Sequence, residues 1–130
     1  MIPFRVVLQP GAPIHEQVGF AARKAMISGQ LRPGDAFPSV RVLSQALKIN
    51  PNTAHKVISQ LISDGLLEVR SGTGTVVAQP RSSPRVERAR LLRTEVEQLV
   101  VEARHLGLTL DEVQASVESH WRKLEPKESA

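Results

Sequence analysis

Apolar side chains recur every three or four positions in three stretches of the N-terminal half of the chain, and this spacing predicts three helices. The first covers about residues 14–28 and ends at a glycine, which accepts the left-handed geometry that closes a helix. The second is short, covers about residues 39–48 and begins with a serine N-cap. The third starts at Asn50-Pro51, because asparagine is favoured as an N-cap and proline at the first helical position, and it stops at Asp64-Gly65. The expected inward positions are Ile14, Val18, Ala21 and Ala25, then Val40, Leu43 and Leu47, then Ala54, Val57, Ile58, Leu61 and Ile62.

A β-hairpin is predicted after the third helix. Leu66–Arg70 and Thr75–Ala78 are rich in Val, Leu and Thr, and Ser71–Gly74 forms a four-residue loop between them. Phe4–Leu8 is expected to be a short strand or an extended arm. Three helices followed by a hairpin are the order of a winged helix. We therefore predict a mainly α fold with a small β wing, the winged helix-turn-helix domain covering residues 1–78.

The remainder of the chain predicts a linker at residues 79–84, which is polar and bracketed by prolines, and a helical tail at residues 85–125. Apolar residues then alternate in steps of three and four, the spacing of a coiled-coil-like seam, until Gly107 ends the helix. Thr109 and Glu112 match a capping box at the start of a last helix. The seam contains Val86, Ala89, Leu92, Val96, Leu99, Ala103 and Leu106, and the last helix is expected to direct Leu110, Val113, Val117, Trp121 and Leu124 inward.

The seam exposes more apolar surface than one short helix can cover, which predicts a homodimer held by a second copy of the tail. Trp121 could instead line a small-molecule site, although packing in a core or interface is favoured. Two tail helices leave little room for a conventional effector pocket, and no effector is assigned. The expected dimerization residues are Leu92, Val96, Leu99, Ala103, Leu106, Val113, Val117 and Trp121.

The second and third helices, joined at Ile49-Asn50-Pro51, form a helix-turn-helix whose third helix would lie in the major groove of double-stranded DNA. Asparagine can pair with adenine, and the methyl group of threonine can pack on thymine. Capping alone would also explain Asn50. The candidate contacts on this helix are Asn50, Asn52, Thr53, His55 and Lys56.

Charge supports a polyanionic partner only weakly. The formal net charge is +4, and all of the excess lies in residues 1–80, which hold eight Lys or Arg against four acids. The chain has no cysteine, no basic run followed by an apolar segment at its N-terminus and no apolar stretch long enough for a membrane span, so a cytoplasmic protein without membrane attachment is expected. The four histidines share no ligand spacing, and no metal or cofactor is expected.

Two other classes of protein fit the sequence less well. An enzyme is disfavoured because the chain has neither a Gly-x-Ser-x-Gly nucleophile motif nor a Walker-type phosphate loop. An interaction protein that recruits a partner with its tail is the second alternative, and a salt-sensitive shift of duplex DNA would distinguish it, because phosphate contacts release counterions.

Six short segments between residues 13 and 77 resemble, in order and spacing, the N-terminal domain of GntR-family regulators. They are Pro13–Gln17, Gly29–Asp35, Pro38–Leu43, Asn50–Thr53, Asp64–Leu67 and Gly72–Val77. The short two-helix tail, including Ala103–Leu110, resembles the YtrA subfamily, in which the tail serves for dimerization.

The resemblance implies DNA roles for individual residues. Arg41 aligns with an arginine that contacts phosphate or base, and Ser71 and Gly72 align with a wing tip that enters the minor groove beside Arg70. The sequence departs from the family pattern at several positions: His15 replaces a common tyrosine, Ala54 a valine, Ile58 a tyrosine and Ile62 a glutamate, and His55 is not the arginine of some relatives. His55 thus leaves the base preference open. The resemblance further implies a repressor that occludes promoters by binding a palindromic operator, with an ABC-transporter or similar membrane-related operon and its own gene as targets.

Overall fold

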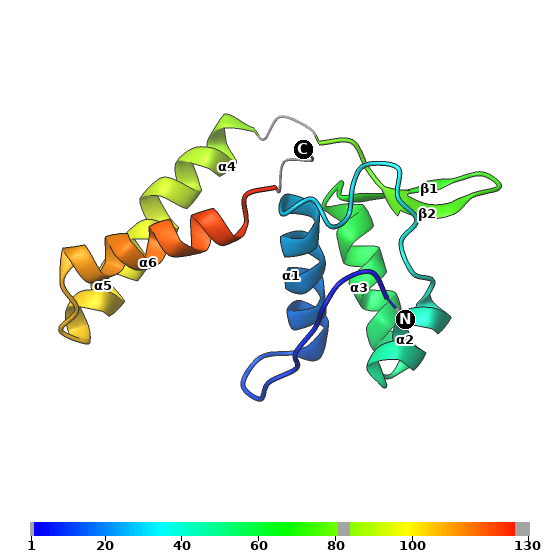
Figure 1. Ribbon diagram of the computed structural model, residues 1–130, viewed down its shortest axis with the longest axis horizontal. Helices are drawn as coiled ribbons and strands as arrows, with labels where there is room; N and C mark the ends of the chain where they lie inside the picture. The colour runs from blue at the N-terminus through cyan, green and yellow to red at the C-terminus, as the bar shows by residue number, and fades with distance from the viewer. Residues whose placement is uncertain (1, 81–83, 127–130) are drawn as a thin grey trace. The chain divides into compact units, whose positions relative to one another are not determined.

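The computed structural model describes residues 2–80 and 84–126, which form two compact units. The first unit contains helices α1 (Ile14–Ile27), α2 (Val40–Leu47) and α3 (Pro51–Ser63), strands β1 (Leu67–Arg70) and β2 (Gly74–Val77), and residues 124–126. The second contains α4 (Arg85–Arg90), the π-helical segment η1 (Leu91–Glu95), α5 (Val96–His105) and α6 (Leu110–Lys123). Figure 1 labels the α-helices and the two strands, and their order confirms the predicted fold class, a winged helix followed by a helical tail. No helix in the described ranges is long and apolar enough to cross a membrane. The linker predicted at residues 79–84 stays a prediction, because residues 81–83 lie outside the described residues.

The predicted starts of α2 and α3 are confirmed by their side-chain caps. Ser39 Oγ accepts a hydrogen bond of 3.1 Å from the N–H of Val42 at the start of α2. Asn50 Oδ1 accepts one of 2.8 Å from the N–H of Asn52 at the start of α3. Each cap satisfies a backbone donor that has no partner within its helix, so the local sequence defines where the helix begins.

The core of the winged domain lies between α1, α2, α3 and the hairpin. It contains Val18, Ala22, Ala25, Leu31, Leu43, Ala54, Val57, Leu61, Leu67 and Val77. Two positions that the periodicity assigned to the interior are wrong. The side chain of Ile62 is 37% exposed and that of Ile14 is 44% exposed. Ile62 follows the buried Leu61 directly, so its side chain is rotated away from the buried face of α3 toward the edge of the core. Ile14 is the first residue of α1 and precedes the buried residues of that helix, which begin at Val18.

The wing is an antiparallel pair in which Leu67 faces Val77 and Arg70 faces Gly74. Gly74 is therefore part of β2, which shortens the predicted four-residue loop to Ser71–Thr73. The connection between α1 and α2 also joins β2. The Gly34 and Phe37 N–H groups donate to the Val77 and Thr75 carbonyls at 2.8 and 2.9 Å. This link ties the wing to the connection between α1 and α2.

The N-terminal arm, residues 2–9, forms neither a strand nor a helix. The buried Phe4 ring stacks on Phe37 with centroids 5.7 Å apart. The Gln17 side chain accepts a hydrogen bond from Gln9 N–H at 2.8 Å and donates to the Gln9 carbonyl at 2.7 Å and the Ala12 carbonyl at 2.8 Å. One amide thus holds the arm on α1.

The long tail helix is interrupted, which corrects the expectation of a regular seam. Residues 91–95 form a π-helical turn between α4 and α5. Because a π turn bonds residues five apart, it brings Leu91 and Val96 toward the same face. Both Leu91 and the predicted seam residue Leu92 are exposed in the single chain, at 57% and 72%.

The tail has almost no core of its own in a single chain. Ala103 is the only buried residue described in the second unit. The expected inward packing of α6 is wrong for the single chain, since Leu110, Val117 and Trp121 are exposed there, while Val113 and Leu124 are half-buried. The capping box is confirmed, because Thr109 N–H donates to Glu112 Oε2 at 2.9 Å and Glu112 N–H donates to Thr109 Oγ1 at 3.1 Å. The tail helices are therefore well defined, and their apolar faces have no cover.

Candidate nucleic-acid interface

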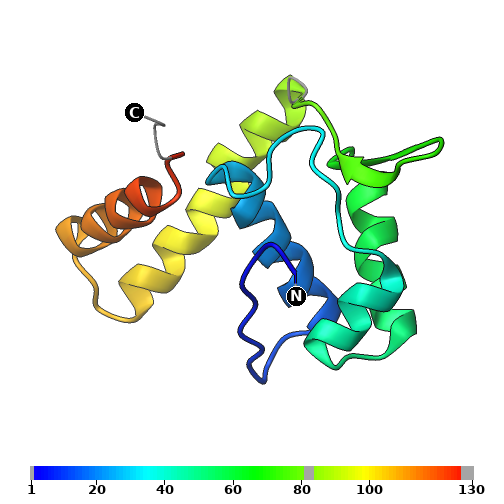
Figure 2. The ribbon, with the colours of Figure 1, turned by 45° about the vertical axis from the view of Figure 1, so that its right-hand side comes forward.

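Helices α2 and α3 form a helix-turn-helix. Lys48 closes α2 with its N–H on the Ser44 carbonyl, and two residues later Asn50 caps α3. Figure 2 shows the short turn between the two helices and the N-terminal end of α3 beside α2. Leu43 on α2 and Ala54 on α3 are completely buried and pack in the same core. The turn therefore holds the first turn of α3 in a defined position.

The first turns of α3 present the polar residues that the sequence predicted. Asn52, His55 and Lys56 are exposed, and Thr53 is half-buried. The structure gives the Asn52 side-chain amide no hydrogen-bond partner among the described residues, so both its donor and its acceptor face solvent. His55 Nδ1 lies 3.4 Å from Ser59 Oγ on the same helix. The arrangement can therefore present amide, hydroxyl and imidazole groups to base edges.

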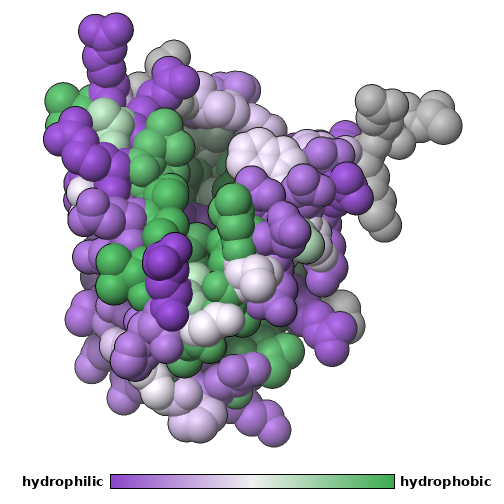
Figure 3. Space-filling model, turned by 90° about the vertical axis from the view of Figure 1, so that its left-hand side faces the viewer, coloured by the Kyte–Doolittle hydropathy of each residue, from purple (hydrophilic) through white to green (hydrophobic). Residues whose placement is uncertain are grey.

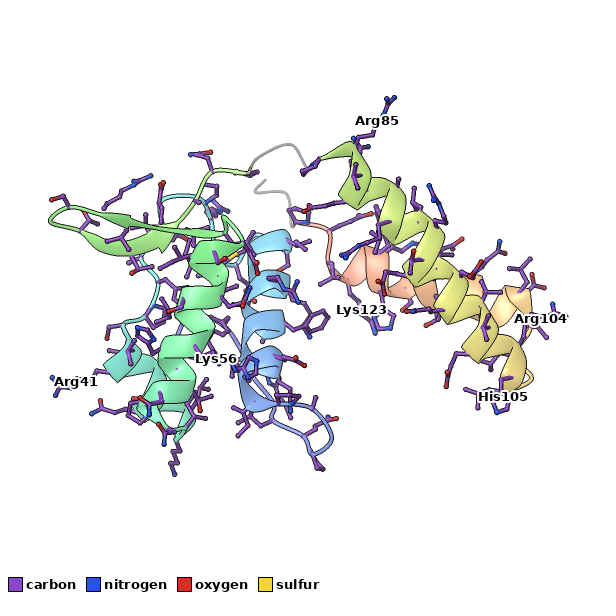
Figure 4. All side chains as sticks on the ribbon, turned by 180° about the vertical axis from the view of Figure 1, so that it is seen from behind. Arg41, Lys56, Arg85, Arg104, His105 and Lys123 are labelled. Carbon is purple, nitrogen blue, oxygen red and sulfur yellow. The ribbon has the colours of Figure 1, made fainter. Side chains whose placement is uncertain are left out.

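The segment that forms the helix-turn-helix contains basic residues but no acidic ones. Residues 36–63 contain Arg41, Lys48 and Lys56 but no Asp or Glu. Figure 4 labels Arg41 on α2 and Lys56 on α3, with the Arg41 side chain extending away from the domain. None of these three side chains is in an ion pair within the part of the chain that the structure describes. An uncompensated positive surface of this kind suits a phosphate backbone.

The wing adds a further predicted group of residues. Arg70, Ser71 and Gly72 are exposed at its tip, where Gly72 has a φ of 79°. Arg70 is not free, because its guanidinium donates to Glu68 Oε1 at 2.8 and 3.2 Å. A half-exposed pair of this type contributes roughly 0–1 kcal/mol, so a phosphate could compete for the arginine.

The role of Asn50 can be separated into capping and base contact. Replacing Asn50 with alanine should lower the free energy of unfolding by about 1 kcal/mol, because the Asn52 N–H loses its acceptor. Replacing it with serine should preserve stability, because serine caps equally well. Chemical denaturation of both variants measures this difference. A stable Asn50→Ser variant with weakened DNA binding would assign the amide a base contact as well, and an alanine variant as stable as the parent would contradict the capping role.

A surface hollow of about 580 Å³ lies elsewhere on the winged domain, between α1 and the C-terminal half of α3. Its wall includes Phe20, whose ring lies 5.7 Å from the Arg23 guanidinium and 5.3 Å from the Lys24 ammonium. None of the residues predicted to contact DNA lines it. The hollow is therefore separate from the candidate interface.

Comparison with known proteins agrees with this geometry. The family model "Bacterial regulatory proteins, gntR family" matches residues 14–77, which span α1 to the end of the wing. The HTH-type transcriptional repressor YtrA of Bacillus subtilis is 30% identical over 102 residues, 78% of each chain. The crystal structure of a transcriptional antiterminator from Listeria monocytogenes superposes with a TM-score of 0.85 at 21% identity, covering 98% of this chain and 96% of that one, and thus shares the fold.

A structure solved on DNA is also similar. The DNA-binding domain of AraR in complex with operator ORX1 is 30% identical, has a TM-score of 0.50, and aligns over 57% of this chain and 95% of its own. A winged domain similar to residues of this chain therefore binds operator DNA in AraR.

Proposed function

Because the chain belongs to the GntR family of bacterial DNA-binding transcription regulators, we propose that it represses transcription by occupying a palindromic operator as a homodimer. The observation that carries this proposal is the first turn of α3, whose exposed polar side chains stand in a basic, acid-free helix-turn-helix. Residues 1–78 are the DNA-binding domain in this proposal, and residues 85–125 are the dimerization tail.

The proposed contacts divide by the part of DNA that they reach. Asn52, Thr53 and His55 read base edges from α3 in the major groove, and Asn50 orients the start of that helix. The cationic side chains of Arg41, Lys56 and Arg70 lie along the phosphate backbone. The wing tip at Ser71 and Gly72 approaches the minor groove. The exposure of these side chains, of which only Thr53 is half-buried, supports the assignment.

The uncovered tail supports the proposed dimer. Many apolar side chains of the tail are exposed. Figure 3 shows one face of the molecule on which hydrophobic side chains gather among hydrophilic ones. Val96, Leu99 and Val117 are each 42–48% exposed in the single chain. A second copy covers these side chains in a symmetric, self-complementary interface, and the two linked winged domains then match two half-sites. The interface residues proposed are Leu92, Val96, Leu99, Ala103, Leu106, Val113, Val117 and Trp121.

Repression is the outcome we propose, because the similar protein YtrA of Bacillus subtilis is described as a repressor. A dimer bound at a promoter excludes RNA polymerase from it. The regulator's own gene and an ABC-transporter or similar membrane-related operon are the proposed targets. Genome-wide binding in the source bacterium, followed by transcript measurement after deletion of the gene, tests this directly. Binding peaks upstream of genes whose transcripts rise on deletion are expected, and peaks whose transcripts fall would replace repression by activation.

Neutralising Arg41 should reduce the number of phosphate contacts. We expect Arg41→Gln to lower the slope of log affinity against log salt by about 0.9, the value for one phosphate, and to leave folding unchanged because the side chain is exposed. Fluorescence anisotropy of a labelled operator at several salt concentrations measures the slope. Arg104→Gln in the tail is the matched control, since it removes the same charge outside the proposed interface. An Arg41→Gln slope equal to that of the parent would remove Arg41 from the interface.

A further inference from the structure

Lys48 has a backbone conformation that is unusual for its residue type. Its φ and ψ are 55° and 47°, and it is the only non-glycine residue with positive φ in the described parts of the chain. The left-handed region crowds the Cβ atom of an L-residue against its own backbone, and glycine avoids this crowding. A lysine here is thus less favourable for folding than glycine would be.

At other helix ends in the described residues, the left-handed position is occupied by glycine, the residue that backbone geometry favours there. The chain leaves α1, α3 and α5 through Gly29, Gly65 and Gly107, whose φ values are 86°, 77° and 77°. Only α2 ends with a charged residue at its left-handed position. Glycine would fit the backbone at position 48 with less strain, so a lysine there points to a function other than stabilising the fold.

The position of Lys48 indicates what that role is. Its side chain is exposed in the turn between α2 and α3, two residues before the N-cap Asn50. Residues 36–63 contain no acid, and none of the ion pairs in the described chain includes Lys48. Neither an ion pair nor a hydrogen bond of the side chain therefore accounts for the lysine. Lys48 precedes Pro51, the first residue of the helix that we place in the major groove, by three positions.

We propose that the Lys48 ammonium group contacts the phosphate backbone of the operator and thereby helps to position α3 on DNA. The benefit of this contact offsets the backbone strain of a lysine in the left-handed conformation. This inference rests on the proposed DNA-binding mode and adds a residue to it. The sequence pattern did not single out Lys48, because its conformation is visible only in the backbone. A lysine ammonium in this turn adds one cation to the track formed by Arg41 and Lys56.

The test uses full-length variants that change charge and backbone preference separately. Lys48→Gly removes the charge and relieves the strain, Lys48→Asn removes the charge with a residue that also tolerates the left-handed region, and Lys48→Arg keeps the charge. Anisotropy titrations with a labelled operator over a range of salt, together with thermal denaturation, are measured for all three. If Lys48 serves the fold, Lys48→Gly should lower the Tm; if it serves DNA binding, Lys48→Gly should weaken binding without lowering the Tm.

If Lys48 contacts phosphate, Lys48→Gly and Lys48→Asn should each lower the salt slope by about 0.9, which corresponds to about eightfold weaker binding at 0.1 M salt. Lys48→Gly should have an unchanged or higher Tm, and Lys48→Arg should bind like the parent. Parental affinity and slope in both neutral variants would overturn the inference while leaving DNA binding intact. Weaker binding with an unchanged slope, or weaker binding in the glycine variant alone, would assign the effect to turn geometry and also overturn it. A parent protein that binds no duplex would instead contradict the proposed function.

Discussion

Replacing Leu99 with lysine should prevent the proposed homodimer from forming and weaken operator binding about 100-fold or more. Leu99 is on α5, near Ala103, which is the buried residue of the tail. Its side chain is 46% exposed in the single chain, so the variant tail can still form its helices as a monomer. In the dimer the same position would be covered, and a buried ammonium without a partner opposes association strongly.

The large expected effect on DNA binding comes from linkage of the two winged domains. In a dimer, binding of one winged domain to its half-site holds the other domain at a high effective concentration near the second half-site. A monomer has to bind each half-site independently. Sedimentation velocity at micromolar protein measures the oligomeric state, and anisotropy measures operator affinity. Gln98→Lys is the matched control, because it places the same charge on the adjacent, exposed position of α5 outside the seam. A monomeric parent protein, or a Leu99→Lys variant that sediments as a dimer, would contradict the tail interface.

Truncation after Pro84 provides a second test of the same interface. The first unit has its own core between α1, α3 and the hairpin, so the truncated chain is expected to fold. It should sediment as a monomer and bind the operator weakly. A truncated chain that still formed dimers would move the interface into the winged domain.

Replacing Asn52 or Thr53 with alanine should cost roughly 1–3 kcal/mol of specific binding each and change non-specific binding little. Asn52 lies in the first turn of α3 with a free side-chain amide, which has the donor and acceptor needed for adenine. Thr53 follows it, half-buried, with a methyl group that suits thymine. Neither substitution removes a charge, so the salt dependence should stay at the parental value.

Competition titrations with the operator and with a scrambled duplex separate the two kinds of binding. Gln60→Ala, in the last turns of α3, serves as the control because it is exposed on the same helix but far from its N-terminal end. Equal operator affinity of both alanine variants and the parent would show that another surface reads the bases.

Much of the winged domain was predictable because local chemistry decides where its elements begin and end. Ser39 and Asn50 cap the helices that follow them, and Gly65 ends α3 in the left-handed conformation that glycine allows. The exposed turn carrying Asn52 follows from the cap and the helical period. The candidate contacts could therefore be named before the fold was known, although their contacts with DNA stay a prediction.

The sequence by itself thus determined the order of the elements, their caps and the polar first turn of α3, all of which depend on residues within a few positions of one another. Tertiary structure decided the features that depend on distant partners or on backbone geometry. Phe37 joins β2 through Thr75, and Ile62 lies at the edge of the core. The π turn of η1 and the left-handed Lys48 have no signature in the hydrophobic period, because helical spacing describes only regular right-handed turns.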